Sequence, residues 1–591
     1  MHSPRPDCST TGNRRFWKLL RFAALKCTIV LGLCARPQAQ AEPRDWSKQV
    51  ADSLLTHSSE ARTARSSEND WSIGIGRQIE GLNAVWYNTA KGDYFRYGKA
   101  RIDALLTNGA SPGLVTDPIA ENLMGRELVL LARVTLTPKY FDAATALRRQ
   151  LAQACALPSA GSVTLHASEA CMAEPFLAEY ASVFQHPEDF DAITRSFEKR
   201  AIASSSGDRA HVLLAEALVD ALPYYPEDDP GRAALIKMIQ ETAIHLVQRQ
   251  YGGPLAGLAS QTMDQPAASL AAYALAKGVR LGYLPVFDAA VAQRTWQSVV
   301  RRVHLDANGV FSVSKSAREL SAEEGDAIGS FLVAAAEMDH AQTAPLGRGQ
   351  TVLLDSWYNS QQRKNAAGEM ESFHYKWTDG SDSGYALLGH MFSSYGVATR
   401  TLSTAPTKDN LRVAQYYLIV SPDIPVKNPT PHYMDEKDAT EVADWVRAGG
   451  VLILMENDPP NADIDHLNLL ASRFGIHFDD VLHHHILGEH VEDGRIQVAP
   501  NGRLFRHPHT LYMKDTCAIT LRKPAVALLR DRGDVVMATT RFGRGTVFAA
   551  VDPWLYNEYT DGRNNPRIYD QFDNFAGGQE LVRWLIEQRS R

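Results

Sequence analysis

The feature that most constrains the fold of this 591-residue chain is a change of hydrophobic pattern near residue 345. Before it, segments such as AHVLLAEALVDAL and AASLAAYALAKGVRLG carry apolar residues three and four positions apart, the spacing of an amphipathic helix. Helices this apolar, recurring over residues 45–342, have to bury two faces, which favours concentric rings of helices. A helical solenoid is the alternative, although the sequence shows no fixed repeat period.

After residue 345 the pattern predicts strands that alternate with helices. TVLLD, YYLIVSP and GVLILME are short apolar runs typical of buried parallel strands. Helical patterns lie between them, and KDATEVADWVRAGG ends on a Gly pair, as a helix C-cap does. We therefore predict a multidomain chain, with an all-α region over residues 42–345 and a doubly wound α/β region over residues 350–591.

The first 41 residues predict an export signal. Basic residues precede an apolar run over residues 22–33, and Ala39-Gln40-Ala41 forms a cleavage site of the A-x-A type. The run is too short to cross a bilayer, so no membrane span is expected after cleavage. The Arg14-Arg15 pair keeps the twin-arginine route open beside the general secretory route. The expected location is the periplasm or the exterior of a bacterium.

Cleavage of this signal would remove seven Lys or Arg residues and one Asp, and would change the formal charge from −7 to −13. A chain this acidic, with no basic stripe, is not expected to bind nucleic acid. Three cysteines, Cys155, Cys171 and Cys517, would remain, so at most one disulfide can form within the chain.

Several segments of the helical half match motifs of known sugar hydrolases. They include WSIGIGRQIEG at residues 71–81, MAEPF at 172–176 with Tyr180, and GSFLVAAAE at 329–337. This half resembles glycoside hydrolase families 88 and 105, the unsaturated glucuronyl and rhamnogalacturonyl hydrolases. The resemblance implies an (α/α)6 barrel of six hairpins with a sugar pocket at one end. It also implies an oligosaccharide ligand, an unsaturated uronide that lyases release from pectin or related polysaccharides.

The position of the family's catalytic acid differs in this chain. In the family, an Asp protonates the enol-ether double bond of the terminal uronic acid, water adds at C5, and the hemiketal opens to release the next sugar. Counting back from Met172 places Ser168 at that position, and a Ser hydroxyl has no titratable proton near neutral pH. Glu169 is adjacent, and Glu121 stands beside Ala120, which matches a second family Asp. Glu169 and Glu121 are therefore the candidate catalytic residues.

The family's W-G-R segment corresponds to Gly207-Asp208-Arg209, which keeps only the Arg. Arg209 and His211 are candidate substrate-binding residues for a uronate, although Arg209 can equally pair with Asp208 or cap a helix. Two hypotheses follow from these departures. The chain is an enzyme that uses Glu169 or a rearranged acid, or it is a pseudoenzyme that binds carbohydrate or supports the α/β region.

The last predicted strand of the α/β region runs into DPWLYNEY at residues 552–559. Ligands of open α/β sheets bind at the carboxyl ends of the strands, and aromatic rings with carboxylates suit a sugar. This region resembles an uncharacterised α/β module of some family 105 proteins, with a flavodoxin-like or glutamine-amidotransferase-like outline. The candidate sugar-binding residues of this region are His374, Trp377, Asp552, Trp554, Glu558 and Tyr559. The equally weighted alternative is that these aromatic residues pack the two regions together.

No cofactor or metal site is predicted. An amidotransferase would need a nucleophilic Cys after a strand, and Cys517 stands inside the strand-like run TCAITLR. His483 and His485 would share one face of a strand, but no carboxylate or Cys lies at standard ligand spacing. The glycines of IGIGRQIEG are surrounded by helix and do not form a dinucleotide loop. The sequence leaves the oligomeric state, the exact sugar and the role of the α/β region open.

Overall fold

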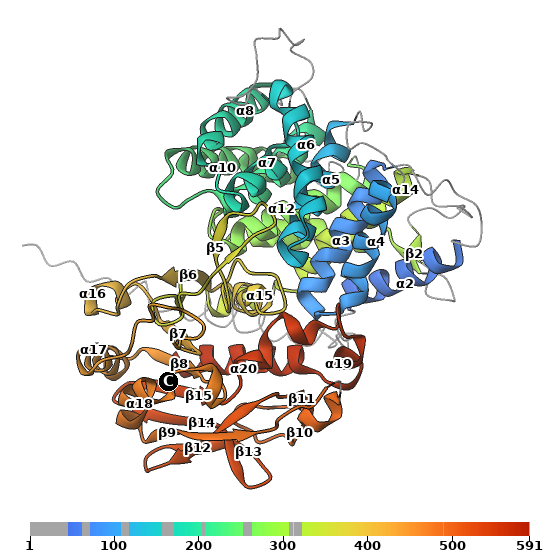
Figure 1. The fold of residues 1–591 in the computed structure, drawn as a ribbon. Helices are drawn as coiled ribbons and strands as arrows, with labels where there is room; N and C mark the ends of the chain where they lie inside the picture. The colour runs from blue at the N-terminus through green and yellow to red at the C-terminus, as the bar shows by residue number, and fades with distance from the viewer. Residues whose placement is uncertain are drawn as a thin grey trace, which may run out of the picture. The chain divides into compact units, whose positions relative to one another are not determined.

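The computed structural model describes residues 45–61, 71–107, 117–155, 171–203, 207–251, 263–305, 311–312, 322–488 and 490–589. Residues 47–591 form one compact unit. The first half of the described chain is helical and the strands of the large sheet come from the second half, as predicted (Figure 1). None of the described helices is long and apolar enough to span a membrane.

Six of the described helices touch one another in a closed cycle, in which each contacts the next and the last contacts the first. They are α3 (Ile73–Thr89), α5 (Pro118–Thr135), α7 (Glu174–Val183), α9 (Asp208–Ala221), α12 (Gln265–Arg280) and α14 (Ala322–Met338). We call these six helices the inner ring. Each of the first five packs against the next helix along the chain: α4 (Gly92–Thr107), α6 (Pro138–Ala154), α8 (Phe190–Ala203), α10 (Pro230–Tyr251) and α13 (Asp288–Val300). The remaining elements of this half are α2 (Trp46–Ala61) and the paired strands β1 (His304–Leu305) and β2 (Phe311–Ser312).

Local sequence fixes where the inner-ring helices begin and how closely they pack. Asp117 caps α5 by accepting hydrogen bonds from two backbone N–H groups of the first turn, and Asp264 caps α12 in the same way through Ala267. Gly125 allows α5 to approach α7, because a Cβ at that position would lie 2.4 Å from Cγ of Phe176. The ring is therefore built from capped helices in close contact.

The α/β half contains one large mixed sheet with the strand order β6-β3-β7-β8-β15-β14-β12-β9, with β13 beside β14. Its strands are β3 (Thr351–Asp355), β6 (Ala398–Leu402), β7 (Tyr416–Val420), β8 (Val451–Met455), β9 (Ile476–His483), β12 (Thr516–Leu521), β13 (Val526–Asp531), β14 (Asp534–Phe542) and β15 (Gly545–Ala550). The first five strands in the order are parallel, and the others pair antiparallel. The predicted doubly wound pattern thus describes five of these strands.

The antiparallel part follows from tight turns. Arg532 and Gly533 join β13 to β14 with positive φ angles of 49° and 104°, as a two-residue hairpin turn requires. The other elements of this half are the hairpins β4 (Gln362–Lys364) with β5 (Met370–Ser372) and β10 (Arg495–Val498) with β11 (His509–Tyr512), and the helices α15 (Ala386–Ser394), α16 (Lys408–Leu411), α17 (Glu436–Arg447), α18 (Ile464–Ala471), α19 (Pro566–Gln571) and α20 (Asn574–Arg589).

The α/β half forms hydrogen bonds with the helical half. Helix α15 contacts both α3 and α20, and α20 contacts β8 and β15. Nε1 of Trp86 on α3 donates to Oδ2 of Asp561 at 3.2 Å, and Nη1 of Arg96 on α4 donates to the carbonyl of Gly562 at 2.6 Å. The helical half and the α/β half therefore share a specific polar interface.

One disulfide, Cys155–Cys171, links the end of α6 to the residues before α7. Cys517 is a free, buried thiol within β12, which agrees with its predicted place in a strand.

Candidate functional site

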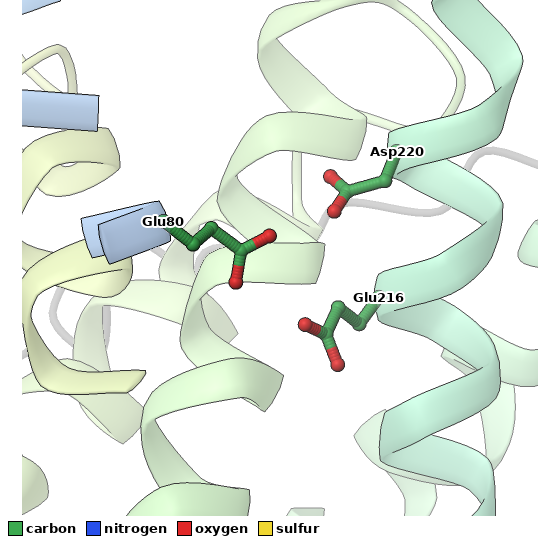
Figure 2. Close-up of side chains that lie close together, drawn as sticks. All are labelled: Glu80, Glu216 and Asp220. Carbon is green, nitrogen blue, oxygen red and sulfur yellow. The ribbon is translucent and has the colours of Figure 1, made fainter. Parts of the chain in front are cut away.

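Three carboxylates meet inside the inner ring, where Glu80 of α3 faces Glu216 and Asp220 of α9 (Figure 2). One oxygen atom of each lies within 4.8 Å of the others, the spacing of a possible metal site. Burial raises the pKa of Glu216, although Arg77 opposes the shift. Burial acts in the same direction on Asp220, but Lys277 and Arg126 outweigh it and lower the pKa of this carboxyl.

The charges of these carboxylates are already compensated by side chains. Arg77 forms two hydrogen bonds with Glu216 and a third with Glu80. Arg126 lies 2.5 Å from Glu80 and 2.7 Å from Asp220, and Lys277 lies 2.7 Å from Asp220. Each of the three carboxylates thus already has a cation within hydrogen-bond distance, and a divalent ion would have to compete with these side chains. We interpret the cluster as an ion-pair network that joins the helices of the ring.

A cavity of about 430 Å³ opens beside this network, within the volume range of small-molecule sites. All six inner-ring helices line it, together with residues of α15 and its surroundings. Its aromatic walls are Tyr87, Tyr224, Tyr273 and Trp377. Its charged walls are Glu80, Arg126, Glu127, Arg133, Glu179, Asp220, Lys277, Arg280 and Glu337. We call this space the central cavity.

The central cavity lies toward the C-terminal ends of the inner-ring helices. Tyr87 and Arg133 belong to the last turns of α3 and α5, and Arg280 is the last residue of α12. His390 of α15 closes this side, where Nε2 lies 2.7 Å from Oδ1 of Asn88. Aromatic faces beside paired charged groups suit a polar ligand with hydroxyl groups, such as a sugar.

Glu127 is a buried carboxyl that lines the cavity and has a raised pKa. Burial raises the pKa of Glu127 to about 7, against the opposing hydrogen bond from Asn83. Nδ2 of Asn83 donates to Oε2 at 2.6 Å. Oε1 has no hydrogen-bond partner among the described residues and points toward α4, 2.7 Å from the place of a Cβ on Gly98. The side chain therefore joins α5 to α3 and α4 as well as lining the cavity.

Two described residues of the predicted hydrolase end, Glu121 and Arg209, pair with different side chains. Glu121 lies in the first turn of α5 and accepts a hydrogen bond from Gln150 of α6 at 3.1 Å. Burial, followed by Asp117, raises its pKa. Arg209 is exposed at the start of α9 and pairs with Asp264 at 2.7 Å. The structure thus separates Glu121, which faces the outer helix α6, from Arg209.

Among the described residues, Arg209 lines only a small space. Arg209 lies 3.6 Å from Asp326, and with Arg77 and Ile119 they line a space of about 10 Å³, enough for one water molecule. His211 is half-buried, and its Nδ1 lies 2.9 Å from the carbonyl of Gly207. Ser168 and Glu169 lie outside the described residues.

Three of the predicted residues of the α/β half form an aromatic group at the carboxyl end of the sheet. Trp554 packs edge to face on Tyr559 with ring centroids 5.0 Å apart, and His374 lies 6.4 Å from Trp554. Lys514 stands 5.6 Å from the ring centres of Trp554 and Tyr559. Asp552 is fully buried beneath, where it accepts backbone hydrogen bonds from Lys514 and Trp554, and burial raises its pKa to about 7.

The other two predicted residues lie elsewhere. Glu558 is buried and accepts a hydrogen bond from the backbone N–H of Leu387 at 2.8 Å, so it caps the first turn of α15. Trp377 lines the central cavity, and its Nε1 donates to the carbonyl of Arg400 at 3.0 Å.

The candidate histidines do not converge on one point. His483, His484 and His485 each face a different carboxylate, namely Asp534, Asp531 and Asp515, at 3.5, 3.0 and 2.9 Å. This arrangement favours separate ion pairs over a shared ligand sphere.

Sequence reasoning missed the charged residues of the central cavity. Arg126 and Arg133 lie seven positions apart in GRELVLLARV, a mainly apolar segment of α5, and so share one face. Charged residues on one face of a mainly apolar helix are the signal that could have pointed to a polar interior.

Comparison with known proteins shows that one segment of the chain is similar to a family of glycosyl hydrolases. Residues 208–340 match Glycosyl Hydrolase Family 88. The matched segment includes α9, α12 and α14 of the inner ring, and it supplies Asp220, Tyr273 and Lys277 to the cavity. No curated protein matches the chain.

Solved structures that are similar to parts of the chain include two glycoside hydrolases and an unrelated domain. A family 105 glycoside hydrolase of C. acetobutylicum ATCC 824 is 19% identical, with a TM-score of 0.40, and covers 50% of this chain and 99% of its own. A family 88 glycosyl hydrolase of Bacteroides vulgatus is 14% identical, with a TM-score of 0.40, and covers 50% and 99%. The mmIFT52 N-terminal domain is 15% identical, with a TM-score of 0.28, and covers 37% and 94%.

Proposed function

We propose that the chain is an exported glycoside-hydrolase-like protein of the unsaturated rhamnogalacturonyl hydrolase type. Its ligands are unsaturated uronic-acid oligosaccharides from pectin or related polysaccharides. The observation that carries the proposal is the central cavity, whose aromatic and charged walls come in large part from the segment that matches Glycosyl Hydrolase Family 88. The closed cycle of inner-ring helices, each with an outer partner, supports an (α/α)6 barrel as the fold of this half.

Export is part of the proposal. The predicted signal at residues 1–41 supports it, and so does the Cys155–Cys171 disulfide, because disulfides form in oxidising compartments such as the periplasm. We propose a periplasmic or secreted location.

The described carboxyls favour binding over hydrolysis. A general acid has to keep a proton and reach the ligand. Glu121 faces α6, and one oxygen of Glu127 is directed at α4 while the other is bonded to Asn83. Asp220 is held in its ionised form by Arg126 and Lys277. Hydrolysis would therefore use Glu169 or a rearranged acid, and the alternative is a pseudoenzyme that binds carbohydrate or supports the α/β half.

One experiment separates these two functions. The mature protein is mixed with oligosaccharides prepared by a pectin-degrading lyase, and the absorbance of their enol-ether bond is followed. Loss of absorbance that is absent in Glu169→Gln identifies an enzyme with Glu169 as the acid. Constant absorbance with binding detected by calorimetry identifies the pseudoenzyme. Neither hydrolysis nor binding would contradict the proposed function in both forms.

A further inference from the structure

The cations that line the central cavity differ in their partners. Arg126 and Lys277 each lie 2.7 Å from Asp220, and Arg280 lies 2.6 Å from Glu337. Each of these three positive charges is compensated by a carboxylate within hydrogen-bond distance. They shape the walls of the cavity, but they leave no free charge for a ligand.

Arg133 is the exception. Among the described residues, no carboxylate oxygen lies within 4.0 Å of its guanidinium nitrogens. Nη2 donates to the hydroxyl of Tyr87 at 3.1 Å, and the buried Nε has no hydrogen-bond partner. Arg133 is half-buried and its guanidinium stays charged under all ordinary conditions, so taking part of that charge out of water without a counterion has a free-energy cost. An anionic ligand at this position would offset that cost.

Glu179 gives the cavity a second incompletely paired group. It is 4% exposed and lies on α7, and its nearest cation is Arg126, with Nε at 3.7 Å. Arg133 and Glu179 line the same cavity as Tyr87, Tyr224 and Trp377. A ligand that suits all of these groups has a carboxylate for the arginine, hydroxyl groups for the glutamate, and a face for the rings.

We propose that Arg133 binds the carboxylate of an acidic sugar in the central cavity, and that Glu179 accepts hydrogen bonds from its hydroxyl groups. The inference rests on the proposed function and adds where the ligand lies. The site is at the C-terminal ends of the inner-ring helices, against α15, and away from Glu121 and Arg209. The α/β half is then part of the site, because Trp377 and His390 form one of its walls.

The test compares D-galacturonate with D-galactose, which has a hydroxymethyl group in place of the carboxylate. We expect calorimetry to show that the wild type prefers galacturonate. Arg133→Met should weaken galacturonate binding about tenfold or more and leave galactose binding unchanged, because a charge-assisted hydrogen bond is lost. Arg133→Lys should keep part of the preference, since lysine retains the charge without the planar fork. The matched control is Arg506→Met, which removes an exposed arginine paired with Glu587 outside the cavity and should keep the full preference.

The outcomes distinguish this inference from the proposed function. A folded Arg133→Met protein that keeps the preference for galacturonate overturns the inference, as does loss of that preference in Arg506→Met. If Arg133→Met does not fold, Arg133→Lys decides, and undiminished affinity for galacturonate in that variant overturns the inference. If the wild type and the Arg133→Met variant bind lyase-generated oligosaccharides equally well, the proposed function stands and this site is rejected. Wild type that binds none of these sugars rejects both.

Discussion

Arg77 of α3 and Glu216 of α9 form a two-pronged ion pair across the inner ring, with Nη2 of Arg77 2.9 Å from Oε2 of Glu216. Both side chains are buried, at 4% and 7% exposure. The two residues are 139 positions apart in sequence, and their pair is part of the ion-pair network inside the ring. The interior of the helical half is therefore held by charge pairing as well as by apolar packing, and that interior is where we place the ligand.

Replacing Arg77 by methionine should lower the free energy of unfolding by about 3–5 kcal/mol, because Glu216 would be left as a buried carboxylate without its partner. Urea denaturation of Arg77→Met against wild type measures the difference. The control is Lys237→Met, which breaks the exposed Lys237–Glu241 pair and should change stability by less than about 0.5 kcal/mol. Equal effects of the two substitutions would show that the buried pair contributes no more to the free energy of unfolding than the exposed pair.

A methyl group at Gly329 should also destabilise the ring. A Cβ there would lie 2.2 Å from the backbone carbonyl carbon of Arg77, and a backbone cannot move aside as a flexible side chain can. Gly329→Ala should cost about 1–3 kcal/mol or more, as overpacking does. Gly207→Ala is the comparison, because nothing lies within 4 Å of a Cβ at that position. Thermal unfolding of both variants tests the close approach of α14 and α3, and an unchanged melting temperature in Gly329→Ala would refute it.

The stability of the protein should depend on pH through Glu127. Burial raises the pKa of Glu127 from 4.5 to about 7 in the folded state. Between these pH values the folded state binds more protons than the unfolded state, so stability falls as pH rises. Glu127→Gln removes this contribution, and its stability relative to wild type should therefore increase by about 3 kcal/mol from pH 4.5 to pH 7. Urea titrations at several pH values give the measurement, and parallel pH profiles would contradict the shift.

Reduction of the Cys155–Cys171 disulfide should lower the free energy of unfolding by about 3 kcal/mol, the value for a loop of about 15 residues. Melting temperatures with and without a reductant test this. The double variant Cys155→Ser with Cys171→Ser provides the control, because a reductant should have no further effect on it. A reductant that lowers the melting temperature of the double variant as much as that of wild type would point to another cause.

Local patterns were enough to predict much of the fold. The runs TVLLD and YYLIV became β3 and β7 because a short, uniformly apolar run suits a strand buried on both faces. The doubly wound prediction did not include the antiparallel strands β13 and β14, because their pairing depends on the short turn at Arg532 and Gly533.

The candidate site was harder to predict, because it depends on which helices meet. Arg133 is surrounded in sequence by apolar residues, and nothing local shows that it lines the same cavity as Tyr224 of another helix segment and Trp377 of the α/β half. The surroundings of Glu121 could not be predicted from local sequence either, because its partner Gln150 is 29 residues away on α6. Family motifs pointed to the N-terminal ends of the inner-ring helices, which follow segments outside the described residues, whereas the central cavity that the described residues line lies toward the C-terminal ends.

The most direct test of the account is a crystal structure of the protein soaked with D-galacturonate. We predict sugar density in the central cavity, with its carboxylate on the guanidinium of Arg133 and its ring beside the aromatic wall. Sugar bound only beside Arg209, or only on Trp554 and Tyr559 at the sheet edge, with the central cavity empty, would contradict the account.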